Sequence, residues 1–84
     1  MTMLGTLNSI YVHKHNNKLC LECEFILPHG GKVLYSNELT HDILNYIYEQ
    51  MKEKNVPRMS YLEGSSALIY IENDEVVGFE FVEA

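Results

Sequence analysis

The stretch HKHNNKLCLEC, from His13 to Cys23, contains the turn from which the fold can be worked out. On both sides of Asn16-Asn17 the residues alternate between apolar and polar, which is typical of strands with one buried face. Asparagine tolerates the positive φ angles that both central residues of a tight hairpin turn require. We therefore predict two antiparallel strands, at 4–15 and 18–27.

This turn also determines which residues of the two strands face each other. His15 pairs with Lys18, and stepping away from the turn places His13 opposite Cys20. Side chains alternate between the two faces of a sheet. The predicted core face carries Ile10, Val12, Leu19, Leu21, Cys23, Phe25 and Leu27, and the predicted outer face carries Tyr11, His13, His15, Cys20, Glu22 and Glu24.

After the first hairpin, the sequence indicates a third strand and one helix. Residues 28–31 are a turn signal before a short strand at 32–35. Ser36-Asn37 is expected to cap the helix that follows, and Asn55 and Pro57 to end it. The helix has an apolar stripe that should face the sheet, made of Leu39, Ile43, Ile47 and Met51, with Leu44 and one of Tyr46 and Tyr48 beside it.

The last third of the chain predicts a second hairpin. A short strand is expected at 58–62, followed by strands at 66–72 and 75–82 around Asn73-Asp74. This turn places Ile71 opposite Val76, Ile69 opposite Gly78 and Leu68 opposite Phe79. One face then carries Leu68, Tyr70, Val77, Phe79 and Phe81, and the other carries Ala67, Ile69, Ile71 and Val76, with Gly78 and Glu80. Because a single helix covers only one of these faces, either a second sheet or another chain should cover the other, and we expect a homodimer interface at Ile69, Ile71 and Val76.

Together these elements predict one α+β domain, residues 1–84, with antiparallel strands and one helix in the order β-β-β-α-β-β(-β). Apolar residues are 46% of the chain, which is enough to form a core. No apolar run approaches the roughly 20 residues of a membrane helix, and the first ten residues do not resemble a signal peptide. We expect a soluble, cytoplasmic protein that contacts no membrane and whose two cysteines are reduced.

Charge is distributed unevenly along the sequence. The net charge is −6, and all six lysine and arginine residues precede Met59. The ionisable side chains after that point, tyrosines aside, are acids: Glu63, Glu72, Asp74, Glu75, Glu80 and Glu83. Direct binding to nucleic acid needs cations that replace the phosphate counterions, so it is disfavoured. An anionic surface suits a basic protein partner, and the plainer interpretation is that these carboxylates keep a small domain soluble.

The histidines and cysteines of the first hairpin raise the question of a metal or redox site. Cys20 and Cys23 form a C-x-x-C motif, but residues i and i+3 of a strand point to opposite faces and cannot chelate one ion. His13, His15 and Cys20 share a face and would be close enough to share a zinc ion. The alternative is an ordinary hairpin with polar residues on its solvated face, and we expect no metal and no other cofactor.

The turn His29-Gly30-Gly31-Lys32 is a second candidate site. Two glycines free the backbone to present N–H groups to an anion, and His29 and Lys32 add positive charge. Such a loop would hold a phosphate or a nucleotide, although the sequence lacks the GxxxxGK[ST] motif of a phosphate-binding loop. The alternative is a plain β-turn.

Tyrosine is the residue type that points most clearly to binding, and the chain has six. Tyr46 and Tyr48 are two residues apart on the predicted helix, so only one can face the sheet. We expect Tyr48 to be exposed beside Glu49. For catalysis, by contrast, neither the thiols nor Ser65-Ser66 have a base at a meaningful spacing, and we expect no enzymatic activity.

These observations favour a non-enzymatic protein-binding module. Its basic partner would contact Glu72, Asp74, Glu75, Glu80, Tyr48 and Glu49. By analogy of size and charge, the module would be a stoichiometric inhibitor or regulator of a nucleic-acid-handling protein, encoded by a virus or a mobile element. The alternative is a sensor or sponge for a small anionic ligand that uses the turn from His29 to Lys32.

Overall fold

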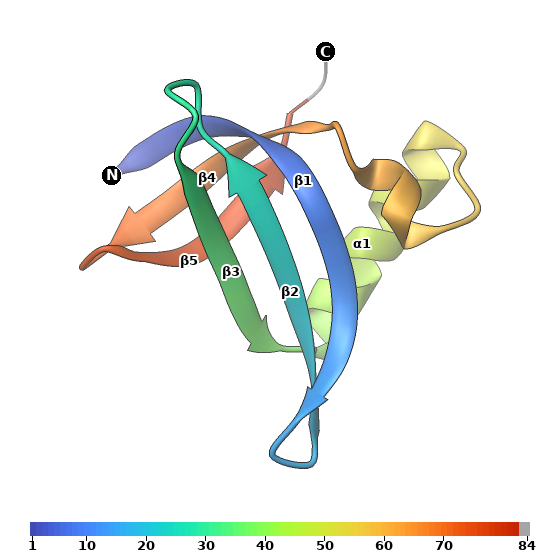
Figure 1. Ribbon diagram of the computed structural model, residues 1–84. Helices are drawn as coiled ribbons and strands as arrows, with labels where there is room; N and C mark the ends of the chain where they lie inside the picture. The colour runs from blue at the N-terminus through green and yellow to red at the C-terminus, as the bar shows by residue number, and fades with distance from the viewer. Residues whose placement is uncertain (83–84) are drawn as a thin grey trace.

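The computed structural model describes residues 1–82 and shows one strongly curled antiparallel sheet with a helix beside it (Figure 1). The α+β class and the order β-β-β-α-β-β are as predicted. The elements are β1 (Thr2–His15), β2 (Lys18–Ile26), β3 (Lys32–Glu38), α1 (His41–Lys54), a 3₁₀ helix η1 (Met59–Leu62), β4 (Ser66–Glu72) and β5 (Glu75–Phe81).

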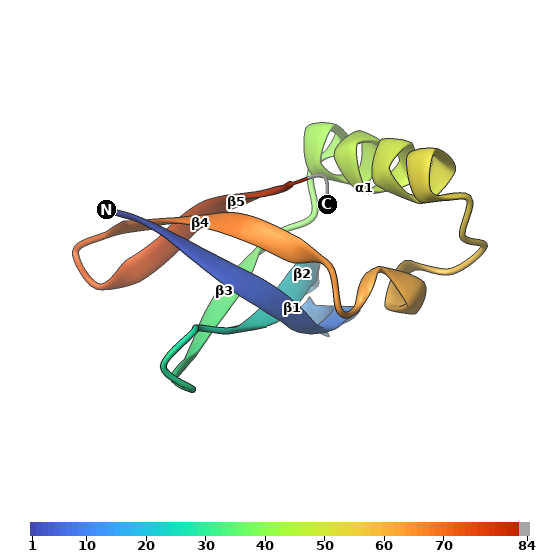
Figure 2. The same cartoon turned by 90° about the horizontal axis from the view of Figure 1, so that it is seen from above.

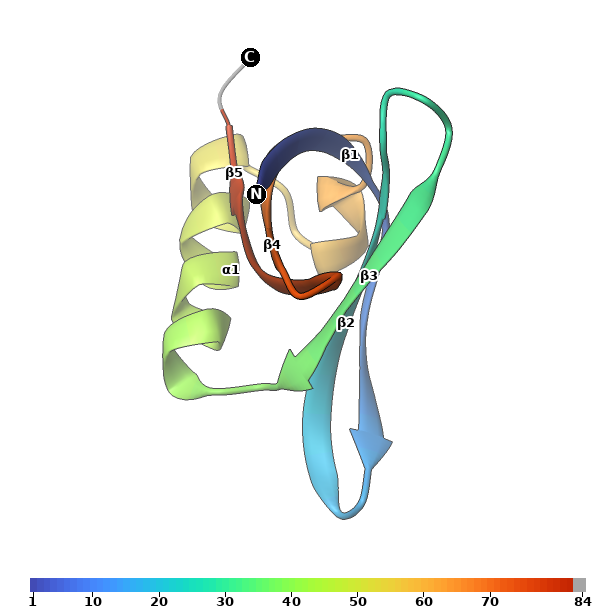
Figure 3. The same ribbon diagram turned by 90° about the vertical axis from the view of Figure 1, so that its left-hand side faces the viewer.

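The long first strand joins the two halves of the sheet, whose strand order is β3-β2-β1-β4-β5. Residues 2–6 of β1 pair with β4, and residues 6–15 pair with β2. The sheet curls until its edge strands β3 and β5 approach each other (Figure 3). The rings of Tyr35 on β3 and Phe79 on β5 are 5.1 Å apart. Its connectivity is that of a barrel of the OB type, left partly open between β3 and β5. Because such barrels serve many functions, the architecture by itself assigns none.

The first hairpin has the predicted turn and register. Asn16 and Asn17 have φ angles of 51° and 63°, and His15 pairs with Lys18 and His13 with Cys20. The predicted core face is buried near the sheet centre, where Leu21, Cys23 and Phe25 are fully covered. Val12 and Leu19, also expected in the core, are 39% and 57% exposed. They lie near the turn, where the hairpin extends past the rest of the molecule (Figure 1).

The helix starts later than predicted. Ser36 and Asn37 do not cap it, because they continue β3 and pair with Glu22 and Leu21 of β2. The N-cap is Thr40, whose Oγ1 accepts a hydrogen bond from the N–H of Ile43 at 3.2 Å. The end of the helix is as predicted: Asn55 has φ 54° and ψ 49°.

Two predictions for the C-terminal part are wrong. Residues 59–62 form a 3₁₀ helix instead of a strand, held by bonds such as Glu63 N–H to the Ser60 carbonyl, and they bury Leu62 completely. In the second hairpin the turn is correct, with φ 51° at Asn73 and 64° at Asp74. The register beyond it shifts by one residue, so that Ile69 pairs with Phe79 rather than Gly78.

A β-bulge causes this shift. Ile71 pairs with Val76 as expected, but the next pair is Tyr70 with Gly78, which leaves Val77 as an extra residue in β5. The bulge turns Phe79 and Phe81 to the same face as Ala67 and Ile69. Ile69 is therefore fully buried within one chain, and Ile71 and Val76 are half-buried against its core. The predicted homodimer surface at Ile69, Ile71 and Val76 does not exist as a free apolar face.

The aromatic residues of β5 connect the sheet to the helix. Phe79 packs against Phe25, Tyr35 and Phe81 at ring distances of 5.2, 5.1 and 5.4 Å. From α1, which lies on the β5 side of the sheet (Figure 2) and runs beside β5 in Figure 3, Tyr46 stacks on Phe81 and Ile47 enters the core. No helix in the described part of the chain is both long enough and apolar enough to span a membrane.

Candidate partner-binding surface

Three predicted partner-binding carboxylates, those of Glu72, Asp74 and Glu75, lie exposed at the tip of the β4–β5 hairpin. None of them forms an ion pair with another residue of the 1–82 range. Glu72 and Glu75 are cross-strand partners, so two like charges face each other beside a third. We call these three residues the acidic tip.

One lysine lies near the acidic tip. A depression of about 530 Å³ between β3 and the hairpin is lined by Lys32 on one side and by Asp74 and Glu75 on the other. The ammonium group of Lys32 lies 3.9 Å from a carboxylate oxygen of Glu24, on the neighbouring strand. Because Lys32 already has a carboxylate partner on β2, it compensates only part of the charge at the tip.

The remaining acids of the C-terminal third have other surroundings. Glu63 accepts a hydrogen bond from the backbone N–H of Ile10 on β1, at 3.2 Å. Glu80 accepts one from the Tyr70 hydroxyl at 3.0 Å. Glu83, which the sequence places in the same acidic segment, lies outside the described residues. The predicted acidic surface is therefore divided, and the acidic tip is its strongest part.

A groove between α1 and β5 forms a second candidate feature. Its volume is about 410 Å³. Four aromatic rings and two carboxylates line it, together with one aliphatic side chain and a glycine: Tyr35, Tyr46, Tyr70 and Phe79, then Asp42 and Glu80, then Ile43 and Gly78. We call this feature the aromatic groove. It has negative and aromatic walls, and none of its lining side chains is basic.

The tyrosine hydroxyls of the aromatic groove stay neutral at physiological pH. The pKa of Tyr70 is raised first by its hydrogen bond to Glu80. Burial raises the pKa values of Tyr35 and Tyr46, although the bond from the Phe81 N–H to the Tyr46 hydroxyl acts in the opposite direction. The formal charge of the groove therefore comes from Asp42 and Glu80.

Tyr48 and Glu49 lie on a different part of the surface. Tyr48 is exposed, as predicted, with 58% of its surface accessible, and Glu49 is exposed next to it. Neither residue lines the aromatic groove. The six predicted partner-binding residues thus fall into three places: the acidic tip, the aromatic groove with Glu80, and the outer side of the helix.

Of the residues that line the aromatic groove, sequence reasoning assigned only Glu80 to partner binding. The groove depends on the bulge at Val77, which places Tyr70 opposite Gly78. A glycine inside an apolar strand pattern is a known sign of a bulge, so Gly78 was the available signal.

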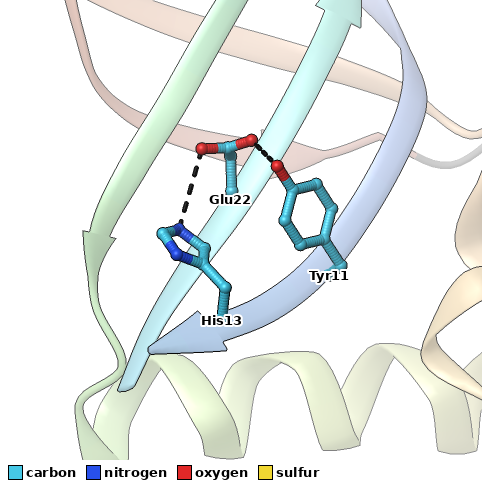
Figure 4. Close-up of polar contacts among 3 residues, drawn as sticks. All are labelled: Tyr11, His13 and Glu22. Carbon is cyan, nitrogen blue, oxygen red and sulfur yellow. Dashed lines mark hydrogen bonds and ion pairs between the residues drawn. The ribbon is translucent and has the colours of Figure 1, made fainter. Parts of the chain in front are cut away.

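The outer face of the first hairpin carries a polar cluster (Figure 4). Glu22 accepts a hydrogen bond from the Tyr11 hydroxyl, and its other carboxylate oxygen lies 3.7 Å from Nε2 of His13. His13 also faces Cys20, as predicted. Within residues 1–82, however, no three His, Cys, Asp or Glu side chains are placed to share a metal ion. His13, His15 and Cys20 therefore do not form the metal site considered from the sequence.

The turn from His29 to Lys32 is not arranged as an anion-binding loop. The Gly30 N–H donates to the Leu27 carbonyl at 2.8 Å, and the Gly31 N–H donates to Nδ1 of His29 at 3.1 Å. Both glycine N–H groups that were expected to face an anion are thus used inside the turn. The structure favours the plain β-turn.

The two cysteines lie on opposite faces, as expected from their spacing. Cys23 is fully buried, and its pKa is raised to about 12, first by burial and then by the charge of Glu22. Cys20 is half-buried, and both thiols are free. The C-x-x-C motif is not a redox pair in this fold, because the two sulfurs point away from each other.

Comparison of the chain with protein-family models, curated proteins and solved structures gave no match.

Proposed function

We propose that this protein is a non-enzymatic module that binds a partner with a basic surface. The observation that carries the proposal is the acidic tip, where Glu72 and Glu75 face each other beside Asp74. Like charges directly opposite in a sheet destabilise the fold, so a cation from outside would relieve this repulsion. A concentrated negative patch also speeds association with a positive partner and selects for it.

The partner class that suits this chemistry is a nucleic-acid-handling protein, whose basic site is built for phosphates. A 9.7 kDa acidic domain that occupies such a site would act as a stoichiometric inhibitor or regulator in the cytoplasm. We propose a viral or mobile-element origin on the same analogy of size and charge. Occlusion of this kind requires complementary shape and charge but no chemical step.

The alternative proposal, a sensor or sponge for nucleotides or phosphate, has lost its main support, since both glycine N–H groups of the His29–Lys32 turn are already bonded. A thermal-shift screen with nucleotides and inorganic phosphate tests it. A ligand at 100 times its Kd should stabilise the fold by about 2.7 kcal/mol.

Homodimerisation remains a prediction, but the surface first assigned to it is not available in the folded chain. Ile69 is in the core and is unavailable for a second chain. Light scattering at micromolar concentration measures the oligomeric state directly.

The proposed function is tested by capture from the native host, followed by binding measurements with the purified partner. Wild-type protein should retain a basic protein at low salt and release it as the salt concentration rises. Glu75→Lys should weaken the measured affinity and flatten its salt dependence. Glu38→Lys makes the same charge change at an exposed position of β3 and serves as the control. Equal affinity for wild type and Glu75→Lys would contradict the proposal.

A further inference from the structure

We propose that the aromatic groove receives one cationic side chain, a lysine or arginine, of the protein partner. This inference rests on the proposed function and specifies how the partner is recognised. Three observations support it: the residues that line the groove, the arrangement of their charges, and the position of Lys54. Lys54 already packs on one end of the aromatic row, which consists of Tyr35, Phe79, Tyr46 and Phe81.

Four of the side chains that line the groove are aromatic. Phe79 has the Tyr35 ring at 5.1 Å and the Tyr46 ring at 6.4 Å, both in edge-to-face arrangements. Tyr70 on β4 lies across from Gly78, where a Cβ would be 3.9 Å from Cδ2 of Tyr70, so the Tyr70 ring borders the space that a side chain at position 78 would take. The face of an aromatic ring carries negative potential and attracts ammonium and guanidinium groups.

Two carboxylates make the same space electrostatically suited to a cation. Asp42, in the first turn of α1, and Glu80 on β5 both line the groove. The Tyr70 hydroxyl donates a hydrogen bond to Oε2 of Glu80 at 3.0 Å, which holds that carboxylate at the groove. Both residues are exposed, so water solvates their carboxylates in the free protein, and a cation packed on the rings would gain charge attraction that an apolar occupant would not.

The chain already binds a cation of its own on the same aromatic row. Nζ of Lys54 lies 5.3 Å from the ring centre of Phe81, and it donates a hydrogen bond to Oγ of Ser65 at 2.8 Å. Phe81 contacts Phe79 and Tyr46, which line the aromatic groove. One end of the row, beside the last turn of α1, is thus filled by a lysine. The other end, beside the first turn, has the acids but no cation.

The occupant is best explained as part of a protein. The acidic tip and the groove residues Tyr70, Gly78 and Glu80 belong to one hairpin, so a basic protein bound along that hairpin would contact both. Arginine is one of the residues that most often carry binding energy in interfaces, usually in well-packed pockets that exclude water. A single inserted side chain would anchor the partner, and the tip would add long-range attraction.

The test is an NMR titration of the isotope-labelled protein with three capped pentapeptides, Gly-Gly-X-Gly-Gly, in which X is lysine, arginine or norleucine. Norleucine has the aliphatic chain of lysine without its charge. The cationic peptides should shift the amide signals of Tyr70, Gly78 and Glu80 in a saturable way. The norleucine peptide should bind about tenfold more weakly, as expected for loss of a cation–π contact and its charge partner.

Three variants locate the binding. Glu80→Gln removes the charge but keeps an acceptor for Tyr70, and it should weaken the lysine peptide about fivefold or more. Gly78→Ala adds a methyl group whose nearest neighbour, Cδ2 of Tyr70, is 3.9 Å away, so it narrows the groove without a steric clash and should weaken both cationic peptides. Glu72→Gln, the matched charge loss at the acidic tip, should change the affinity of the peptides less than twofold.

Equal binding of the norleucine peptide, absence of saturable shifts at the groove, or equal effects of Glu80→Gln and Glu72→Gln would each overturn the inference. None of these results bears on capture of a basic protein through the acidic tip. If Glu75→Lys still weakened partner binding, the proposed function would stand and only the anchoring role of the groove would fail.

Discussion

Glu72 and Glu75 face each other across the tip of the β4–β5 hairpin, next to Asp74. Replacement of one of them by a cation converts a repulsive cross-strand pair into an attractive one. We therefore expect Glu75→Lys to increase the free energy of unfolding by roughly 0.2–1 kcal/mol, while it weakens partner binding. Urea unfolding followed by circular dichroism measures the first effect.

Glu38→Lys is the matched comparison for stability as well. It removes an exposed contact with Lys18 at 3.9 Å and should lower stability slightly or leave it unchanged. A gain in stability of equal size for both variants would mean that relief of net negative charge, and not the cross-strand pair, is responsible. Asp74 is unsuitable for charge reversal, because its φ of 64° makes most substitutions strain the turn.

The backbone N–H of Phe81 donates to the hydroxyl of Tyr46 at 2.8 Å, so a helix side chain caps the free edge of β5. Tyr46→Phe keeps the ring stacked on Phe81 but leaves this donor without a partner. We expect a loss of about 1–3 kcal/mol in the free energy of unfolding. Tyr48→Phe, on the exposed side of the same helix, should change stability by less than about 0.5 kcal/mol. Equal losses for the two variants would contradict the proposed edge contact.

The bulge in β5 predicts different losses of stability for Ile69→Ala and Val77→Ala than a regular register would. Ile69→Ala should cost about 2–5 kcal/mol, because Ile69 is fully buried in the core. Val77→Ala should cost less than about 0.5 kcal/mol, because Val77 is the extra residue of the bulge and is 49% exposed. The regular register places Val77 on the face of Phe79 and Phe81. A loss of stability well above about 0.5 kcal/mol for Val77→Ala would therefore support the regular register and contradict the bulge.

The first hairpin could be predicted from the sequence because its information is local. Asn16-Asn17 fixes the turn, the turn fixes the pairing, and alternation sorts the faces. The same reasoning gave the second turn correctly and then failed at Val77, because a bulge depends on how a strand packs against distant parts of the chain. That one residue moved Ile69 into the core and created the aromatic groove.

The helix start shows the same limit. Ser36 and Asn37 are good capping residues, but pairing with β2 holds them in a strand until Glu38. Thr40, which the sequence analysis did not single out, caps the helix instead. Likewise, the sequence suggested that the glycines of the His29–Lys32 turn have free N–H groups. In the folded turn, Leu27 and His29 accept hydrogen bonds from these groups.

The buried thiol of Cys23 makes stability depend on pH above 9. Its pKa is about 12 in the folded chain and 9.0 for an ordinary cysteine, so the folded state keeps a proton that the unfolded state loses. This contribution is complete below pH 9 and disappears as pH rises towards 12, with a total of about 4 kcal/mol. Burial of Tyr35 and Tyr46 acts in the same direction at alkaline pH. Urea unfolding at pH 7, 9 and 10.5 should therefore show progressively lower stability.

Cys23→Ala separates the thiol from the tyrosines. The variant loses some stability at pH 7, because it leaves a small cavity in the core, but its stability should fall less steeply between pH 9 and 10.5. Cys20→Ala removes the half-buried thiol on the outer face and should retain the wild-type decline. If Cys23→Ala and wild type lost the same amount over this interval, the alkaline dependence would have to arise from the tyrosines alone. Cys23 would then not be shielded from solvent at high pH as its position in the core requires.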